Sequence, residues 1–359
     1  MCTGPTMSAN YFTVAQRNGH WWFITPEGQP FWSMGMNHLD SATLRYPESG
    51  SIWQDTYGNS HERWIKEGVA LDLDAWGFNT IGWTQEVVVR GAAKDQTYEG
   101  MHRHSRSWTH EEYQWADMPY CHLLPFAEIH QWDVETCYPD VFSQGFEDWC
   151  DHVARDQCAR MAEDPNLIGY FYVDCPSWAH VPKWNPKGPW FDPESLKTQA
   201  GRDELAKTAT RYYQITHDAI RRYDPNHLIL GDRYEGRTLV PDEVLLAATP
   251  YVDVMSFQYF GMPEEICPDF QRWHELTGKP VLLADACAPG RRTETYGPMA
   301  RALRELPCCI GWHLCGAYLR NRCRNHGFRD ERNELIQPLV EKATAVNHGT
   351  HRWVAEVTA

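Results

Sequence analysis

Eight short apolar segments recur along this chain, and stretches with helical periodicity separate most of them. The segments cover residues 31–37, 79–83, 120–126, 167–174, 227–232, 252–258, 280–285 and 309–313. Short apolar runs that end at polar or turn-forming residues are typical of buried strands. Eight strands in alternation with helices predict an α/β fold, the closed (β/α)8 TIM barrel.

Helical periodicity is clearest over residues 62–76 and over residues 204–223. The second segment ends before the Asp-Pro pair at residues 224–225. Further helices are expected over residues 146–162, 270–277, 296–306 and 334–345. A doubly wound open sheet would show the same alternation, but no glycine-rich phosphate loop follows any strand. We therefore expect a single barrel domain over residues 1–359, with a short N-terminal hairpin at about residues 11–30.

Two long loops interrupt the alternation, at residues 87–117 after the second strand and at residues 175–198 after the fourth. Both leave the carboxyl ends of the strands, where barrels of this kind bind substrates. Tryptophan, proline and polar residues alternate in the second loop. It suits a wall of a sugar subsite, and a plain surface lid is the alternative.

Composition limits the class of ligand. The net charge is −15 and no cluster of basic residues resembles a phosphate-binding surface, so we expect no nucleic-acid partner. Aromatic residues make up 13% of the chain, with 17 Trp and 17 Tyr. Such side chains stack on sugar rings, although they also fill large cores. An oligosaccharide is the expected partner.

The 12 cysteines form no CxxC pair, and several lie inside expected strands or helices, so reduced thiols are expected. His and Cys lack ligand-like spacing, and we expect no metal and no cofactor. The N-terminus lacks the pattern of a signal peptide, and no apolar run is long enough to cross a membrane. A cytoplasmic protein is expected, or a periplasmic or secreted one if the start was trimmed; homo-oligomerisation stays open.

Polar residues stand at the end of every expected strand, which is where barrel enzymes hold their functional groups. An ordinary cap or turn explains any single one of them, but their presence at all eight ends favours a site. They are Asn37, His38 and Asp40; Trp83; His122; Asp174 and Cys175, with Trp178 beyond them; Asp232 and Arg233; Gln258 and Tyr259; Asp285; and Trp312 and His313.

Five segments in order resemble the clan A glycoside hydrolases, closest to the β-agarase and β-galactosidase-like branch. The segments are residues 26–37 (PEGQPFWSMGMN), 76–82 (WGFNTIG), 138–142 (YPDVF), 167–171 (LIGYF) with Trp178, and 279–285 (KPVLLAD). In that clan the fourth strand usually ends in Asn-Glu, whose Glu is the general acid/base, and the seventh ends in a Glu nucleophile. The resemblance also equates Tyr259 with a tyrosine that binds the nucleophile, and Trp312 with the aromatic floor of the sugar site.

The chain departs from that pattern at both catalytic positions. Asp174-Cys175 stands where Asn-Glu is expected, and Asp285 stands where the nucleophile is expected. We predict Asp174 and Asp285 as the catalytic pair, with Asp174 taking over the acid role. Their shorter side chains widen the gap between carboxyl groups, which favours inversion through water. His122 and His313 are alternative acids, since imidazole titrates near neutrality.

The predicted function is a glycoside hydrolase that trims β-galactoside or agar-type oligosaccharides from the chain end. Arginine binds carboxylate or sulfate well, so recognition of an anionic sugar by Arg233 and the arginines of residues 320–324 is an alternative. A carbohydrate-binding protein that has lost turnover is the second hypothesis, motivated by Cys175. A third is altered sugar chemistry, such as elimination or hydrolysis of an anhydro-sugar.

Overall fold

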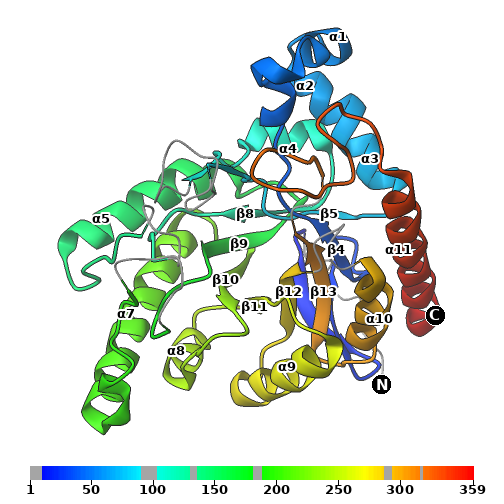
Figure 1. The fold of residues 1–359 in the computed structure, drawn as a ribbon. Helices are drawn as coiled ribbons and strands as arrows, with labels where there is room; N and C mark the ends of the chain where they lie inside the picture. The colour runs from blue at the N-terminus through cyan, green and yellow to red at the C-terminus, as the bar shows by residue number, and fades with distance from the viewer. Residues whose placement is uncertain (1–9, 90–102, 130–135, 181–187, 287–292, 316–317) are drawn as a thin grey trace.

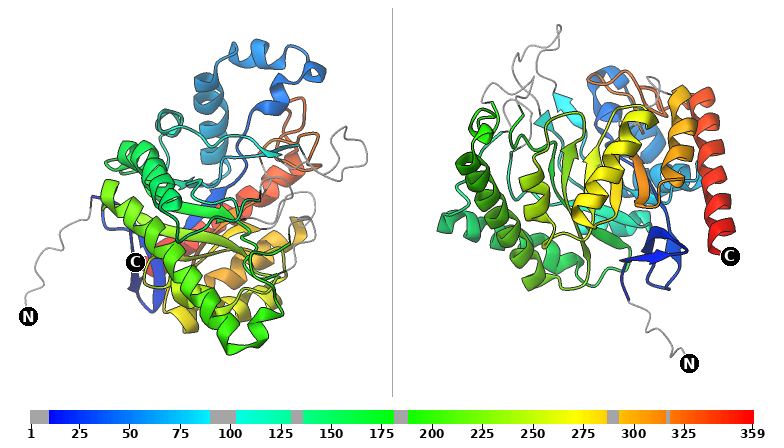
Figure 2. Two further views of the ribbon diagram at one scale, coloured as in Figure 1. Left: turned by 90° about the vertical axis from the view of Figure 1, so that its left-hand side faces the viewer. Right: turned by 90° about the horizontal axis from the view of Figure 1, so that it is seen from below.

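A closed barrel of eight parallel strands, surrounded by helices, forms the body of the molecule (Figures 1 and 2). The computed structural model describes residues 10–89, 103–129, 136–180, 188–286, 293–315 and 318–359. The barrel strands in chain order are β4 (Ser33–Met36), β5 (Thr80–Ile81), β8 (Tyr120–Leu123), β9 (Leu167–Asp174), β10 (Leu228–Glu235), β11 (Met255–Gln258), β12 (Val281–Ala286) and β13 (Cys309–Leu314). The predicted TIM barrel is confirmed.

Each barrel strand falls within or beside one predicted apolar segment. The main difference is in β10, which continues to Glu235, beyond the predicted end at residue 232. Pairing of β13 with β4 closes the barrel. Because all eight strands are parallel, their carboxyl ends meet at one rim, called the barrel mouth below.

Helices cover the outside of the barrel. They are α1 (Ile52–Tyr57), α2 (His61–Arg63), α3 (Ala70–Ala75), α4 (His110–Ala116), α5 (Gln144–Val153), α6 (Ala159–Met161), α7 (Gln199–Tyr223), α8 (Asp242–Ala248), α9 (Pro263–Thr277), α10 (Thr293–Arg304) and α11 (Gln337–Thr358). Two π-helical segments, Trp64–Val69 and Ala154–Cys158, join α2 to α3 and α5 to α6. Side chains set the helix starts: Thr109 and Glu112 form a capping box at α4.

The predicted N-terminal hairpin region forms a small antiparallel sheet of β1 (Thr13–Arg17), β2 (His20–Ile24) and β3 (Pro30–Phe31). Phe12 and Phe23 pack with Ile168, Leu230 and other strand residues in one apolar cluster inside the barrel. This cluster fills the barrel below the mouth. The floor of any site at the mouth is therefore a packed apolar layer.

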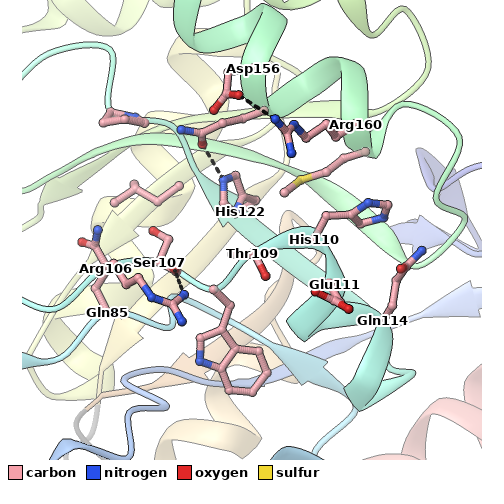
Figure 3. A pocket seen from close by; sticks show the side chains of 15 residues that line it. Gln85, Arg106, Ser107, Thr109, His110, Glu111, Gln114, His122, Asp156 and Arg160 are labelled. Atoms are coloured by element: carbon pink, nitrogen blue, oxygen red, sulfur yellow. Dashed lines mark hydrogen bonds and ion pairs between the residues drawn. The ribbon is translucent and has the colours of Figure 1, made fainter. Parts of the chain in front are cut away.

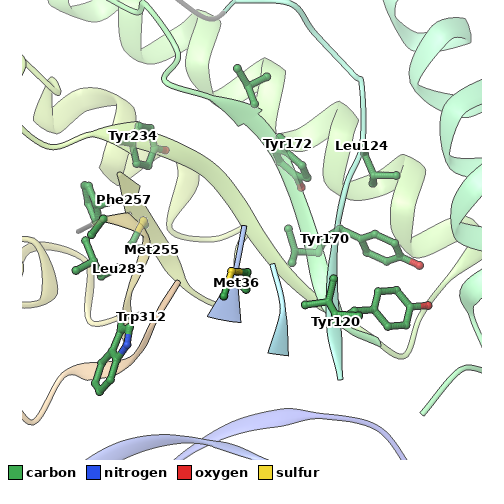
Figure 4. Packing of buried hydrophobic residues seen from close by; sticks show 14 of the residues in the cluster. Met36, Tyr120, Leu124, Tyr170, Tyr172, Tyr234, Met255, Phe257, Leu283 and Trp312 are labelled. Carbon is green, nitrogen blue, oxygen red and sulfur yellow. The ribbon is translucent and has the colours of Figure 1, made fainter. Parts of the chain in front are cut away.

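A second apolar cluster lies between the strands and the surrounding helices (Figure 4). It contains strand residues such as Tyr170, Phe257 and Leu283, whose side chains point away from the barrel axis. Successive strand residues alternate between this outer cluster and the interior. The phase of that alternation decides which polar side chains reach the mouth.

Glycine bulges change the phase in two strands. In β10, Leu228 and Leu230 face the interior, and strict alternation would send Asp232 inward as well. Gly231 has φ +67°, and the register of β10 against β9 shifts on both sides of it. Such a conformation suits glycine, and the extra residue of a bulge reverses the alternation. Arg233, not Asp232, consequently faces the interior.

The same change occurs in β13 at Gly311, which has φ +151°. A Cβ atom at this position would lie 2.2 Å from the carbonyl oxygen of Ser33 on the neighbouring strand. Ile310 faces the interior before the glycine, and His313 does so after it, where its ring bonds Ser33. Trp312 therefore points outward.

The long loops carry structure of their own. After β5, β6 (Val87–Val89) pairs with β7 (Arg103–His104), and α4 follows; residues 90–102 of this predicted loop lie outside the described part. In the loop after β9, Trp178 stacks on Trp190 with ring centroids 4.8 Å apart. Residues 181–187 of this loop also lie outside the described part.

Nine cysteines of the described residues are free thiols: Cys121, Cys137, Cys150, Cys158, Cys175, Cys267, Cys308, Cys309 and Cys315. Among the helices of the described residues, none has both the length and the apolar character that a membrane crossing requires.

Candidate active site at the barrel mouth

Two carboxylates and one guanidinium form the centre of the barrel mouth. Arg233 on β10 donates from Nη2 to Asp174 Oδ1 at 2.7 Å and from Nε to the same oxygen at 3.2 Å. The same Nη2 lies 3.7 Å from Asp285 Oδ2 on β12. All three side chains are almost fully buried. The two predicted catalytic carboxylates thus share one counter-charge.

One oxygen of each carboxylate contacts the same guanidinium nitrogen of Arg233, at 2.7 and 3.7 Å, so these two oxygens lie no farther apart than the sum of the two distances. The carboxyl groups of inverting pairs are roughly 6.5 to 9.5 Å apart, and inversion stays a prediction. Arg233 also occupies part of the space between them.

Asp285 has the environment of a titrating group near neutrality. Burial raises its pKa to about 6, the negative charge of Asp174 adds to the rise, and Arg233 and a hydrogen bond from Asn37 oppose it. Asn37 Nδ2 donates to Asp285 Oδ1 at 2.6 Å and to the Ala284 carbonyl oxygen at 2.8 Å. Asn37 therefore fixes the rotamer of Asp285, and it accepts from the Trp83 backbone N–H in turn.

One nitrogen of the Arg233 guanidinium makes no hydrogen bond to the described residues. Its Nη1 is buried and has no hydrogen-bond partner among the described residues. The guanidinium carbon lies 4.5 Å from the centre of the Trp83 ring, a cation–π contact that holds the group in plane. A buried donor without a partner costs free energy, and an oxygen atom of a ligand would satisfy it.

A second polar cluster adjoins Asp285 and consists of His38, Glu86, Cys315 and Arg324. Arg324 donates from Nε to Glu86 Oε1 at 2.5 Å, and its Nη2 lies 3.3 Å from His38 Nε2. His38 Nδ1 lies 2.7 Å from the Gln85 carbonyl oxygen, so Nδ1 carries the proton and Nε2 accepts. Burial and the charges of Arg324 and Arg233 lower the pKa of His38 well below its usual value. The imidazole is neutral.

His38, Asp285 and Cys315 are the group of described residues whose geometry fits a metal ion, with ligand atoms within 4.8 Å of one another. However, the Arg324 guanidinium lies at two of these atoms, 3.3 Å from His38 Nε2 and 3.6 Å from Cys315 Sγ. A fixed positive charge at the ligand atoms opposes a divalent cation. The donor set therefore does not fit a metal without displacement of Arg324.

Backbone strain marks two residues of the mouth. His38 has φ +59° and Cys175 has φ +51°, whereas the other described non-glycine residues with positive φ are Asn or Asp, which tolerate it. Strained backbone of this kind, costing about 1–3 kcal/mol, clusters at functional sites. Cys175 is buried, and its backbone N–H donates to the Arg233 carbonyl oxygen at 2.9 Å.

The structure brings eight of the predicted site residues to the mouth. They are Asn37, His38, Trp83, Asp174, Cys175, Arg233, Gln258 and Asp285. Arg324, one of the arginines of residues 320–324 that the sequence offered for an anionic sugar, lies there too. Three residues of the mouth were not predicted: Glu86, Glu235 and Cys315. Glu235 could have been found from period-two alternation with Arg233, but nothing local in the sequence pairs Glu86 with Arg324.

Two predicted residues, Asp232 and Trp312, face the helices instead of the mouth. Asp232 accepts hydrogen bonds from Tyr212 and Tyr213 of α7 at 3.2 and 2.5 Å, which corrects its expected place at the mouth. Trp312 donates to Tyr296 of α10 at 2.9 Å and lies in the outer cluster (Figure 4), so it is not the floor of the mouth. The physical cause of both corrections is the glycine bulge before each residue.

His122 also points outward, because the interior position of β8 belongs to Cys121. Its Nε2 lies 2.8 Å from Gln157 Oε1, on the wall of a separate cavity of about 770 Å³ beside α4 (Figure 3). Burial lowers its pKa to about 4. This position and this pKa remove it as an acid at the mouth.

The remaining predicted residues have structural partners. His313 lies under the mouth, bonded to Ser33 at 2.9 Å, and burial lowers its pKa to about 3. Tyr259 donates its hydroxyl to Asp269 at 2.7 Å, and only its backbone N–H contacts Asp285. Asp40 accepts from the Ala42 N–H at 2.7 Å.

Trp178 packs against Tyr212 and Tyr213 of α7, and is almost fully buried. The stacked pair of Trp178 and Trp190 therefore anchors the loop after β9 to α7. Trp83 does reach the mouth, where its ring and that of Phe171 both contact the Arg233 guanidinium.

Comparison with known proteins places the fold. No protein-family model and no curated protein matches the chain. Solved structures do: an agarase (TM-score 0.70, 16% identity, 96% of this chain and 64% of that one) and an exo-β-agarase (0.71, 17%, 96% and 66%). A GH2 β-galacturonidase from Eisenbergiella tayi follows (0.54, 11%, 94% and 54%). The chain spans about two thirds of the length of the two agarases.

Identities this low show the fold alone. That fold is the barrel of the clan A-like glycoside hydrolases, as the resemblance of the sequence segments implied.

Proposed function

We propose that this chain, which has the barrel of the clan A-like glycoside hydrolases, is itself a glycoside hydrolase. The observation that carries the proposal is the pair Asp174 and Asp285, which come from different strands and face one guanidinium at the mouth. Glycoside cleavage requires carboxyl groups on both sides of the scissile bond. Asp285 is the group that attacks the anomeric carbon or activates water there.

The environment of Asp285 supports this role. With a pKa of about 6, it is ionised at neutral pH and close enough to neutrality to act as a base. Asp174 accepts two N–H donors from Arg233, a charge-assisted pair that holds both side chains in place. We assign to Asp174 and Arg233 the binding of sugar oxygens and the stabilisation of charge around Asp285.

A β-galactoside or agar-type oligosaccharide, trimmed from its chain end, is the proposed substrate. The agarases among the similar structures support the class of sugar. Both carboxylates are almost fully buried, with 2% and 6% of Asp285 and Asp174 exposed. Such burial suits a chain end that enters the mouth better than a polymer that crosses an open groove.

The test is a screen of agar-derived and β-galactoside oligosaccharides, with NMR observation of the first anomer released. We expect cleavage by the native protein and its loss in Asp285→Asn, with Asp242→Asn as the matched control at the half-exposed start of α8, away from the mouth. Near-native turnover by Asp285→Asn on every cleaved glycoside would contradict the proposal. The same spectra would identify elimination or an anhydro-sugar product.

A carbohydrate-binding protein without turnover is the second candidate. The observation that favours it is the pair Cys175 and Arg233: a thiol stands where the resemblance places the acid, and a guanidinium fills part of the gap between the carboxylates. Calorimetry distinguishes the two candidates. Tight binding of an oligosaccharide without product after long incubation supports the binding protein.

A further inference from the structure

Among the described residues, neither Cys175 nor Asp174 is a suitable proton donor for a leaving group. The thiol of Cys175 is buried, and burial together with the charges of Asp174 and Glu235 raises its pKa well above the usual value. Such a thiol donates a proton poorly near neutral pH. Asp174 forms an ion pair with the fully buried guanidinium of Arg233. A hydrolase with this mouth needs its acid elsewhere.

Glu235, the last residue of β10, presents a third carboxylate at the mouth. It follows Arg233 by two residues in the same strand, so both side chains share the inner face after the Gly231 bulge. The residue between them, Tyr234, faces outward, where its hydroxyl lies 2.5 Å from that of Tyr213 on α7. Glu235 is 5% exposed and had not been predicted from the sequence.

The partners of Glu235 connect it to both catalytic strands. Gln258 Nε2 donates to Glu235 Oε2 at 2.8 Å, and Gln258 is the register partner of Asp285 in the β11 and β12 pair. On the other side, the β9 and β10 pair places Arg233 against Asp174, and Cys175 bonds the Arg233 backbone. Glu235 therefore lies beside Cys175, the position that the acid would occupy.

The charges around Glu235 come from four elements. Asp174 and Cys175 lie on the β9 side, Arg233 lies on its own strand, and Asp285 lies beyond Gln258 on β12. Arg237, in the turn after β10, approaches Oε1 with its backbone N at 3.2 Å and its Nε at 3.4 Å. The Arg237 side chain is half exposed. Two carboxylates and two arginines therefore surround Glu235.

We propose that Glu235 is the proton donor of the hydrolase, in place of Asp174 and of the residue at position 175. The inference rests on the proposed hydrolase function. As the glycosidic C–O bond breaks, its electron pair stays on the leaving oxygen and takes the carboxyl proton of Glu235. Asp285 attacks the anomeric carbon, or removes a proton from the water that does. Water supplies the remaining OH group and restores the proton.

A structural reading of Glu235 competes with this one, because the carboxylate also orders the turn at Arg237. The two readings predict different kinetics. A proton donor matters for a poor leaving group, such as a sugar hydroxyl, and hardly for a good one, such as dinitrophenolate. A structural residue affects both substrates equally, since it changes the shape of the site.

The experiment compares an oligosaccharide with a 2,4-dinitrophenyl β-galactoside in Glu235→Gln, an isosteric change. We expect kcat/KM to fall about 10²- to 10⁴-fold on the oligosaccharide and less than about tenfold on the aryl glycoside. Asp174→Asn is the matched control, and we expect it to slow both substrates alike.

Three outcomes would overturn or relocate the assignment. Equal losses on both substrates in Glu235→Gln would make Glu235 a structural residue. If Asp174→Asn, and not Glu235→Gln, loses activity on the oligosaccharide but hardly on the aryl glycoside, then Asp174 is the proton donor. If the native protein cleaves neither substrate, both the hydrolase function and the donor fail, a result that differs from cleavage with an unaffected Glu235→Gln.

Discussion

Arg233 and Asp174 form a buried ion pair at the mouth of the barrel, joined by two hydrogen bonds of 2.7 and 3.2 Å to one carboxylate oxygen. The pair comes from adjacent strands in register. Because Arg233 also reaches towards Asp285, it sets the charge balance of the whole site. The predictions below depend on this balance and on the glycine bulges that direct Arg233 inward.

Removal of the guanidinium should damage the site and the fold together. Arg233→Met leaves two buried carboxylates without their counter-charge, and loss of one partner of a buried pair costs about 3–5 kcal/mol. Denaturant unfolding at pH 7 checks the loss. Arg233→Met with Asp174→Asn removes one of the orphaned charges and should recover part of the stability; no recovery would contradict the ion-pair account.

Activity should have an acidic limb with a midpoint near pH 6. Asp285 must be ionised to act as nucleophile or base, and its pKa is about 6. Below that pH, kcat/KM should fall about tenfold per pH unit. Arg233→Lys, which keeps a charge but loses the planar fork, should move the midpoint to higher pH, because Arg233 lowers the pKa of Asp285. A pH profile without this limb would count against Asp285.

Asp232 should affect stability and its pH dependence, with no specific effect on turnover. Burial raises its pKa to about 7. The folded state therefore holds a proton that the unfolded state has lost, so this residue's contribution to stability falls as the pH rises from about 4 to about 7. Asp232→Asn removes that dependence.

Between pH 5 and pH 8, the free energy of unfolding of Asp232→Asn should rise by more than about 2 kcal/mol relative to that of the native protein, since each pKa unit corresponds to about 1.4 kcal/mol. Urea unfolding at both pH values measures this change. The turnover of the folded variant should match the native value. A constant difference at both pH values would show that Asp232 titrates normally in the folded protein.

The bulge at Gly311 should tolerate no side chain. Alanine would place its Cβ 2.2 Å from the Ser33 carbonyl oxygen, a backbone atom that cannot move without breaking the β13 and β4 pair. We expect a loss of more than about 3 kcal/mol, beyond the cost of strain alone. Gly19→Ala is the matched control, since Gly19 also has positive φ (+78°) but nothing within 4 Å. Thermal unfolding of both variants checks the difference.

The sequence predicted the strands well because each is a short, nearly continuous apolar run. The run at 167–174 shows why: it is long enough for one strand, and it ends at a carboxylate. The carboxyl ends of parallel strands meet at one rim, so Asp174 and Asp285 were expected to lie near each other. Their shared contact with Arg233 agrees with that expectation.

The orientation of individual side chains could not be read in the same way. Asp232 and Trp312 end apolar runs, yet both face the helices, because Gly231 and Gly311 insert bulges that reverse the alternation. A glycine in a strand reads equally well as a bulge or as a close approach of two backbones. The sequence alone does not distinguish these cases.

Local apolar patterns were enough to predict the barrel, the order of its strands along the chain and the carboxylates at its rim, because the carboxyl ends of parallel strands meet at one edge. The contacts between residues far apart in the sequence became known from the folded structure alone. Arg324 pairs with Glu86 across two distant loops, and Glu235 stands beside Cys175. Such pairings depend on the register between strands and on bulges, which are set by packing throughout the barrel and leave no local pattern.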